Sequence, residues 1–335
     1  MKCILLTGGK IDDYKYIKSI IAAYGNADVL ICADSGASHL EKLGYMPCPD
    51  QPSPVQPPGL DQPGLDQPSP DLPSSPDQPG LNRPSPDQPP SPDRSGLDRP
   101  SPNQPPGPNQ PGLDLPSGPE HPGFDQPGPN QPPGSDRPEP GSHYDQIAHR
   151  LIVGDMDSVD PQLLESCYAS GFDALHFPAA KDFTDTELAA EEAINMGCVS
   201  ILILGALGGR CDHSHANTML LMKLAHKNIR AVIADEKNLV TAITNRMEIH
   251  KSDILSSFFG FPASGTAKPH SNTRNLSLFP LGGEARGVTT TGLAYPLVNF
   301  TMPPDYTSGV SNFIMHSKAS ISIISGCLLV ITSHN

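Results

Sequence analysis

The chain has 335 residues and a formal net charge of −14, and this acidic balance gives no electrostatic reason to expect nucleic acid or an anionic membrane as a partner. A ligand that carries phosphates would therefore need a metal ion or a locally built anion site. No segment approaches the roughly 18–20 apolar residues of a membrane span, and the apolar run at the amino terminus is too short for a signal peptide. The seven cysteines form no Cys-x-x-Cys pair and are interpreted as reduced thiols, so we expect a cytoplasmic enzyme.

Apolar runs alternate with amphipathic stretches along the first part of the chain. The predicted strands are 3–9, 28–37, 150–158, 173–178, 199–209 and 230–235, and the predicted helices are 12–25, 38–45, one from about 161, 185–196 and about 213–226. This alternation is typical of an α/β domain with a mostly parallel sheet and flanking helices, which we assign to residues 1–235. Ligands of such sheets collect at the carboxyl ends of the strands.

A proline-rich tract interrupts this domain. Residues 47–140 hold 32 of the 40 prolines, and "LNRPSPDQPP" at 81–90 returns as "LDRPSPNQPP" at 97–106. Glycine has no period of three, which excludes collagen, and almost nothing apolar is available to bury. We therefore predict a long disordered insertion over 47–142. Binding to proline-recognising modules is the alternative, but a tolerated expansion of a surface loop is favoured.

Short alternating segments replace the helical pattern after about residue 236. They are "LVTAIT", "RMEIH", "LSLFPLG", "GVTTTGLAYPL", "KASISIISG" and "CLLVITS". Such segments predict a compact antiparallel β-sandwich domain over 236–335. Residues 254–275 fit neither a strand nor a helix pattern and are predicted to be a second, irregular insertion.

Acidic residues gather where predicted strands end. Asp34 follows the second strand, and Asp155 and Asp157 follow the third with a single residue between them. Side chains at i and i+2 of an extended segment point the same way, so these two carboxylates would repel each other unless a cation lay between them. Hard oxygen ligands suit Mg²⁺, which often takes one or two carboxylates together with substrate phosphates.

A second acidic pair, Asp182 and Asp185, precedes the helix predicted at 185–196. Thr184 followed by Glu187 forms a capping-box pattern, so both carboxylates should lie at or near a helix amino terminus. The helix dipole alone explains acidic residues at such a position, and for Asp182 this structural interpretation is the alternative to a catalytic role.

A glycine-rich turn connects the strand at 199–209 to the next helix. It contains Gly205, Gly208 and Gly209, with Arg210 and Asp212 at the junction. Glycines let the backbone approach a phosphate, the helix start offers free N–H groups, and an arginine can bond two phosphate oxygens. An ordinary strand-to-helix turn is the alternative. His213 and His215 lack a third nitrogen or sulfur ligand nearby, so a zinc site is disfavoured.

Taken together, these segments resemble the thiamin pyrophosphokinase family in its bacterial form. The matching segments are "ADSGA" (33–37), "GDMDS" (154–158), "KDFTDTELA" (181–189), "GALGGRCDH" (205–213), "SLFPLGGEARGVTTTGLAYPL" (277–297) and "GVSN" (309–312). They occur in the family's order and cover nearly all of the chain outside the two insertions. One departure is Phe313, which stands where the family usually has Glu.

The resemblance implies transfer of pyrophosphate from ATP to the hydroxyl of thiamin, with release of AMP, by a homodimer whose active sites lie between subunits. Carried over by position, Asp34, Asp155, Asp157 and Asp185 would hold Mg²⁺ and the triphosphate, with Asp182 alongside as a further catalytic carboxylate. The residues implied to line the ATP site are Thr184, Gly208, Gly209, Arg210, Asp212 and His213. Ser311 and Asn312 would contact thiamin.

Two other functions are compatible with part of the pattern. A glycosyltransferase can also use an Asp-x-Asp pair with a divalent cation and a nucleotide, but it predicts neither the second acidic pair nor the β domain. A catalytically impaired relative that acts as a binding protein would keep the fold while its insertions abolish turnover. Incubation with ATP, Mg²⁺ and candidate acceptors separates these alternatives.

Overall fold

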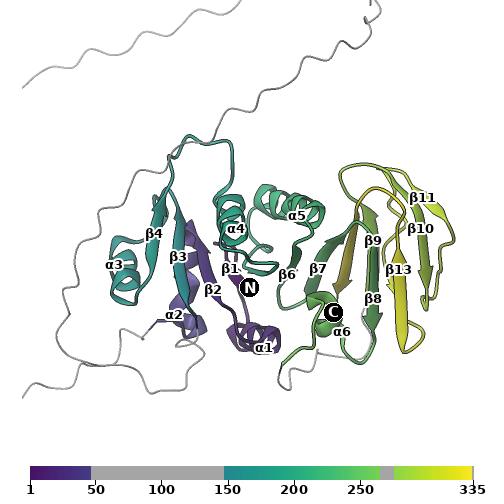
Figure 1. Cartoon of the computed structure of the whole chain (residues 1–335), viewed down its shortest axis with the longest axis horizontal. Coiled ribbons are helices and arrows are strands. Elements are labelled where there is room, and N and C mark those ends of the chain that lie inside the picture. The colour runs from purple at the N-terminus through teal and green to yellow at the C-terminus, as the bar shows by residue number, and fades with distance from the viewer. Residues whose placement is uncertain (47–146, 265–274, 334–335) are drawn as a thin grey trace, which may run out of the picture. The chain divides into compact units, whose positions relative to one another are not determined.

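The structure is a computed structural model, and its described residues are 1–46, 147–264 and 275–333 (Figure 1). The proline-rich insertion predicted at 47–142 lies outside them, as do 265–274 of the second predicted insertion. Within the described part of the chain, no helix has both the length and the apolar character needed to cross a membrane. The cysteines in these ranges are all free thiols, and all but Cys211 are buried, as predicted.

A ten-stranded sheet runs through the described chain, and six of its strands are mutually parallel. These six are β1 (Lys2–Leu6), β2 (Val29–Ala33), β3 (His149–Gly154), β4 (Asp173–His176), β5 (Ser200–Leu204) and β6 (Arg230–Ala234). They lie in the order β6-β5-β1-β2-β3-β4. The chain therefore adds strands on one side of β1 up to β4 and then crosses to the other side at β5. The predicted parallel sheet is confirmed.

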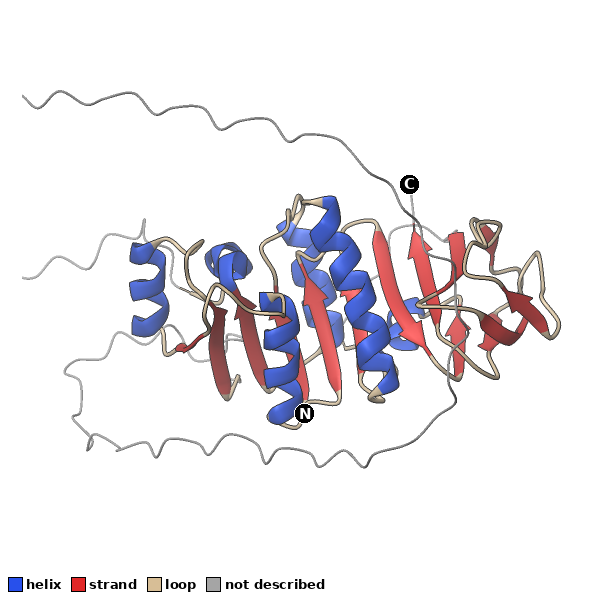
Figure 2. Ribbon diagram, turned by 90° about the horizontal axis from the view of Figure 1, so that it is seen from above, coloured by secondary structure: helices blue, strands red, loops and turns tan. Residues whose placement is uncertain are grey.

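Helices cover both faces of the parallel strands (Figure 2). On β1, Cys3 and Leu5 belong to the apolar cluster that includes α4 (Asp185–Asn195) and α5 (Cys211–His226). Ile4 and Leu6 point the other way, into the cluster with α1 (Tyr14–Tyr24), α2 (Leu40–Leu43) and α3 (Pro161–Ala169). The strands are apolar along their whole length because each face is buried, which removes the polar alternation of a one-sided sheet.

The antiparallel strands continue the same sheet. β7 (Asn238–Ile243) pairs with β6, and the order then runs to β14 (Leu328–Ser333), β9 (Asn275–Pro280) and the edge strand β12 (Asn312–Phe313). A second, four-stranded sheet holds β11 (Phe300–Met302), β10 (Ala285–Thr291), β13 (Lys318–Ser322) and β8 (Arg246–His250). Apolar residues of both sheets share one core, as in the predicted sandwich. The boundary predicted near residue 235 falls in the turn between β6 and β7.

The start of the second predicted insertion proves to be ordered core, and that part of the prediction is wrong. Residues Ile254–Phe259 form the short helix α6, capped at its start by Asp253, whose side chain accepts a hydrogen bond from the Ser256 N–H at 3.1 Å. Phe258 and Phe259 are fully buried, and the Phe259 ring stands edge-on to Tyr24 with the ring centroids 5.1 Å apart. Only six residues long, the helix shows too little periodicity to be recognised in the sequence.

The segment predicted as a helix over 38–45 also differs in the structure. A 3₁₀ helix, η1 (Asp34–His39), begins directly at the end of β2 and precedes the single turn α2. Gly36 explains the tight path, because a Cβ there would lie 2.2 Å from the carbonyl oxygen of Leu6. The close packing of η1 on β1 therefore fixes where Asp34 emerges from the sheet.

Because α6 is part of the core, Phe258→Ala should destabilise the protein by about 3–5 kcal/mol, the range measured for buried Phe truncations. Urea unfolding followed by circular dichroism measures the loss. Val298→Ala, at a side chain that is 81% exposed, is the matched control and should change stability little. A loss below about 1 kcal/mol for Phe258→Ala would mean that α6 is dispensable after all.

Candidate active site

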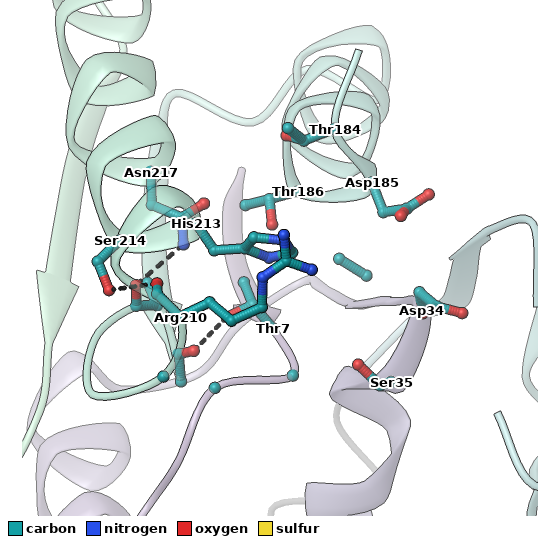
Figure 3. A pocket seen from close by; sticks show the side chains of 16 residues that line it. Thr7, Asp34, Ser35, Thr184, Asp185, Thr186, Arg210, His213, Ser214 and Asn217 are labelled. Atoms are coloured by element: carbon teal, nitrogen blue, oxygen red, sulfur yellow. Dashed lines mark hydrogen bonds between the residues drawn. The ribbon is translucent and has the colours of Figure 1, made fainter. Parts of the chain in front are cut away.

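A cavity of about 430 Å³ opens where the strand order reverses, at the carboxyl ends of β1, β2 and β5 (Figure 3). Its walls come from the residues after these strands and from the first turns of α4 and α5. At such a point the connections that follow two neighbouring strands run to opposite sides of the sheet. The space between them forms a crevice, whatever side chains line it. The cavity therefore lies at the strand ends, where ligands of such sheets collect, and Asp34 and Asp185 are among the residues that line it.

Glycines form the floor of this cleft. A Cβ on Gly9 would lie 2.0 Å from the carbonyl oxygen of Gly205, so the turns after β1 and β5 touch backbone to backbone. Gly205 has φ +69°, a conformation that other residues rarely adopt. The Thr7 hydroxyl donates a hydrogen bond to the Gly205 carbonyl and ties the same two turns together. This floor leaves backbone, rather than side chains, facing a ligand.

Helix α5 presents one face to the cleft. Arg210, His213, Ser214 and Asn217 follow the spacing of a single helical face, and all four line the cavity. Asn217 is buried and its side-chain amide donates to the Ala206 carbonyl at 2.9 Å, which anchors the helix to the end of β5. The N-cap residue Arg210 makes no capping hydrogen bond with its side chain, but the His213 N–H donates to Asp212 Oδ1 at 3.0 Å. Among the described hydrogen bonds, the N–H groups of Cys211 and Asp212 are the ones left available to an anion.

Arg210 extends from this helix start as an exposed cation. Its guanidinium pairs with the Asp212 carboxylate, with Nη2 and Oδ2 2.6 Å apart. The contact raises the pKa of Arg210 and lowers that of Asp212, because each charge stabilises the other. Both side chains are well exposed, so the pair contributes little to folding and leaves the arginine free to exchange partners.

Carboxylates line the opposite side of the cleft from Arg210 and His213 (Figure 3). Asp34 is 8% exposed and has φ +45°, and its Oδ1 is buried with no hydrogen-bond partner among the described residues. A Cβ on Gly154 would lie 3.0 Å from the Asp34 Cβ and 3.1 Å from Asp185 Oδ1. Asp34 and Asp185 therefore meet across a glycine, and strain is stored at the former.

Lys181 lies between two of the acidic residues. Its Nζ is 2.7 Å from Asp185 Oδ1 and 3.5 Å from Asp155 Oδ2, and its side chain is only 12% exposed. Burial lowers the pKa of this ammonium, but the charges of Asp185 and Asp155 outweigh that effect and the net shift is upward. Lysine side chains are seldom so buried unless they are paired with an acidic residue. Here the ammonium brings together Asp155 and Asp185, which are distant from each other in the sequence.

Of the other acidic candidates, Asp155, Asp157 and Asp182 are absent from the lining of the cavity. Asp157 and Asp182 are exposed, and the Asp157 N–H donates to Asp155 Oδ1 at 3.2 Å. Thr184 caps α4 as predicted, accepting from the Glu187 N–H at 3.2 Å, and it lines the cavity together with Gly209. Gly208 and Asp212 adjoin the cavity in sequence and are absent from its lining.

Ser311 and Asn312 are far from this cleft within the sheet. Asn312 begins the edge strand β12, and Ser311 directly precedes it. This strand is six strands away from β1, or about 29 Å at the usual strand spacing. The Asn312 side chain is engaged with the Tyr295 backbone: its amide donates to the carbonyl at 2.8 Å and its oxygen accepts from the N–H at 3.0 Å. Asn312 lines a separate small cavity of about 80 Å³.

The donor set suits a hard cation that also has phosphate ligands. Among the described residues, no three acidic, histidine or cysteine side chains converge closely enough to enclose a metal by themselves. Mg²⁺ does not require such a cage, because it keeps waters and takes one or two carboxylates plus substrate oxygens. The unpartnered buried oxygen of Asp34, beside Asp185, fits that chemistry.

Several cleft residues escaped the sequence interpretation. Thr7, Gly8, Gly9 and Ser35 all line the cavity, and Lys181 pairs with its carboxylates. The Gly8-Gly9 pair at the end of the first strand was the available signal, because glycines at that position commonly let a ligand approach the backbone. Lys181 carried no such signal, since a lysine beside an aspartate usually indicates a solvated surface.

Models of two protein-family domains match the chain. Residues 137–233 match the catalytic domain of thiamin pyrophosphokinase, and residues 266–328 match its vitamin B1 binding domain. Thiamine pyrophosphokinase of Bacillus subtilis is 30% identical over 181 residues, covering 54% of this chain and 76% of the relative. Thiamine pyrophosphokinase 1 of Oryza sativa subsp. japonica is 29% identical over 211 residues, covering 58% and 72%.

A solved structure supports the fold independently of sequence identity. The thiamin pyrophosphokinase family protein from Enterococcus faecalis superimposes with a TM-score of 0.55 over 100% of both chains at 16% identity. At that identity the likeness concerns the fold alone.

His39 is a buried residue that holds the turn after β1 in place. It is 6% exposed, its Nε2 lies 2.9 Å from the Gly9 carbonyl oxygen, and its Nδ1 lies 2.8 Å from the Tyr14 hydroxyl. The carbonyl can only accept, so the neutral ring donates from Nε2 and accepts the Tyr14 proton at Nδ1. Burial lowers the pKa of His39, which favours this neutral form.

A depressed pKa in the folded state means that the unfolded chain binds the proton first as pH falls below the usual value of about 6.5. The free energy of unfolding should therefore decrease between pH 7.5 and 5.5, and His39→Gln should reduce that decrease. Chemical denaturation across this range measures the slope, with the exposed His226→Gln as control. An identical slope in His39→Gln and the unmutated protein would contradict this.

Proposed function

This chain belongs to the thiamin pyrophosphokinase family, and on that premise we propose that it transfers a pyrophosphoryl group from ATP to the hydroxyl of thiamin with Mg²⁺ as the metal. The products are thiamin diphosphate and AMP. The observation that carries the proposal is the cleft at the strand reversal, where a glycine floor, the start of α5 with Arg210, and the Asp34–Asp185 pair face one cavity.

Each part of the cleft has a task in this reaction. The backbone of the turns after β1 and β5 and the first turn of α5 bind phosphate oxygens, as helix starts commonly do. Arg210 exchanges Asp212 for a phosphate and adds a bidentate contact. His213 and Thr184, on the cavity wall, limit how the nucleotide lies. When bound, Mg²⁺ neutralises phosphate charge, and Asp34, Asp155 and Asp185 would hold it, with the exposed Asp157 beside Asp155.

The chemical step is a displacement at the β-phosphorus. The thiamin hydroxyl oxygen forms the new bond, the bond from the β-phosphorus to the oxygen of the α-phosphate breaks, and AMP leaves with that electron pair. The hydroxyl proton passes to a carboxylate of the cleft. Most of the rate enhancement then comes from alignment and from electrostatic stabilisation of the phosphates, by analogy with phosphoryl transfer.

Two chains would have to cooperate in this reaction. The Asn312 region, proposed to contact thiamin, is about 29 Å from β1 along the sheet, and the hydrogen-bonded strands between them prevent the two from approaching. A homodimer in which β12 of one subunit meets the nucleotide cleft of the other would join both halves. Within one subunit, Asn312 acts by holding the Tyr295 backbone, and exposed Tyr295 and Phe313 offer apolar surface beside it.

One prediction of this proposal concerns Asp155. Asp155→Asn should lower kcat by roughly 100-fold or more, because it weakens the binding of the metal ion that neutralises the phosphates, while the fold is retained. The assay follows AMP and thiamin diphosphate from ATP, Mg²⁺ and thiamin. Asp173→Asn makes the same change at the exposed amino end of β4, on the other edge of the sheet, and should be silent.

Near-normal turnover by Asp155→Asn at saturating Mg²⁺ would remove Asp155 from the metal site. Absence of AMP formation by the unmutated protein would contradict the activity itself. Sugar transfer from a nucleotide sugar in the same preparation would instead support a glycosyltransferase.

A further prediction of this proposal concerns an active site shared between two subunits. Asp155→Asn damages only the nucleotide half and Asn312→Ala only the thiamin half, so each variant alone should be nearly inactive. After the two are unfolded and refolded together, the heterodimer contains one intact site, and statistical mixing should restore about a quarter of the normal activity. Refolding each variant alone is the control. Failure of the mixture to exceed the sum of the separate variants would mean that each chain uses its own two halves.

A further inference from the structure

Lys181 is enclosed by acidic side chains that belong to different elements. Asp185 starts α4, whereas Asp155 follows β3 and lies 26 positions earlier than Lys181 in the sequence. The ammonium is 2.7 Å from one carboxylate and 3.5 Å from the other. Asp34 lies near Asp185 across Gly154, and among the described residues no ion pair joins it to Lys181. A single ammonium thus faces two carboxylates, and the ion pairs of Asp155 and Asp185 within the described ranges are both with this lysine.

This contact differs from an ordinary surface ion pair. The Lys181 side chain is 12% exposed, against 38% and 40% for Lys223 and Lys227, which pair with Glu191 between α4 and α5. Lys181 Nζ and Asp185 Oδ1 are both inaccessible to solvent, and neither makes a hydrogen bond of good geometry within the described ranges. Coulomb attraction does not depend on that geometry, so the pair is held by charge in a site that screens charge poorly.

We propose that Lys181 is a positioning residue that serves as the internal counter-ion of the acidic group and competes with the divalent cation for Asp155 and Asp185. The inference rests on the proposed function, because it takes these carboxylates as the metal site. A monovalent ammonium keeps the carboxylates together without fixing their oxygens in the geometry a metal needs. Like charges repel strongly at this separation, so the ammonium lowers the affinity of the free protein for a metal.

ATP removes this competition. Its phosphates offer new acceptors to Lys181, and a lysine binds phosphate as a mobile point charge on a flexible stem. Once the ammonium turns to the phosphates, Asp155 and Asp185 are available to the metal. Nucleotide and metal therefore strengthen each other's binding, and by linkage the effect is the same in both directions. The protein then avoids binding metal without its substrate.

Metal titrations of three variants test this role apart from activity. Mn²⁺, detected by electron paramagnetic resonance, replaces Mg²⁺, and α,β-methylene-ATP supplies a nucleotide that cannot break at the bond this reaction cleaves. Lys181→Met should bind Mn²⁺ about tenfold more tightly than the unmutated protein when no nucleotide is present, within the usual range of coupling between sites. With the nucleotide analogue, this advantage should disappear.

Lys181→Arg keeps the charge and should behave like the unmutated protein. Lys227→Met is the matched control, since it also removes a lysine paired with a carboxylate, at the far end of α5 and about 24 Å from the helix start. It should leave Mn²⁺ binding unchanged. Thermal melts of each variant with and without Mn²⁺ check folding, and Mn²⁺ should raise the melting temperature of Lys181→Met more than that of the others.

Equal or weaker Mn²⁺ binding by folded Lys181→Met without nucleotide overturns the role of Lys181 and leaves the metal site intact. An unmutated protein that binds no Mn²⁺ even with the nucleotide analogue overturns the metal site, and the inference with it. If Lys181→Met does not fold, Lys181→Arg decides: its longer, more delocalised cation must still couple Mn²⁺ to nucleotide, and loss of that coupling with retained Mn²⁺ binding also contradicts the proposal.

Discussion

The reversal of strand order at β1 is the constraint from which the site follows. The chain places β2, β3 and β4 on one side of β1 and β5 and β6 on the other, so the connections after β1 and β5 diverge. The two turns can still touch, at Gly9 and Gly205, because neither carries a side chain there. A larger residue at either position would fill the crevice or separate the strands. The backbone path thus creates the cavity, and the polar side chains are added at its walls.

The walls carry opposite charges that are matched internally. Arg210 pairs with Asp212 on the α5 side, and Lys181 pairs with Asp155 and Asp185 on the α4 side. A cleft with unpaired carboxylates facing a triphosphate would repel it, and one with unpaired cations would bind many anions. Pairing within the protein reduces both the repulsion of the triphosphate and the unselective binding of anions. Each charged side chain exchanges its partner only for a ligand that binds it more strongly. Asp34, strained and with a buried unpartnered oxygen, is the part of the site that stays unsatisfied.

Sequence reasoning identified what depends on local patterns. The apolar runs predicted the parallel strands, Thr184 and Glu187 predicted the start of α4, and the Asp-x-Asp pair predicted carboxylates at the end of β3. It failed where tertiary contacts decide. The short helix α6 is ordered because Phe258 and Phe259 are buried in the core. A six-residue segment is too short for its sequence to show a helical pattern. Lys181 became a site residue only because β3 brings Asp155 beside it.

The sequence pattern did not predict that one continuous sheet joins the parallel and the antiparallel strands. The antiparallel strands, predicted as a β-sandwich domain from residue 236, are joined to the parallel strands because β7 pairs with β6 and the Thr241 hydroxyl donates to the Ala231 carbonyl at 2.7 Å. Shared hydrogen bonds make the two parts rigid with respect to each other, so no hinge can bring β12 to the cleft. Each strand adds a fixed spacing across the sheet, so motion of a loop cannot reduce the separation of six strands between β12 and β1. Under the proposed function, the nucleotide cleft and the Asn312 region would therefore form one complete site only if a second copy of the chain supplied one of them.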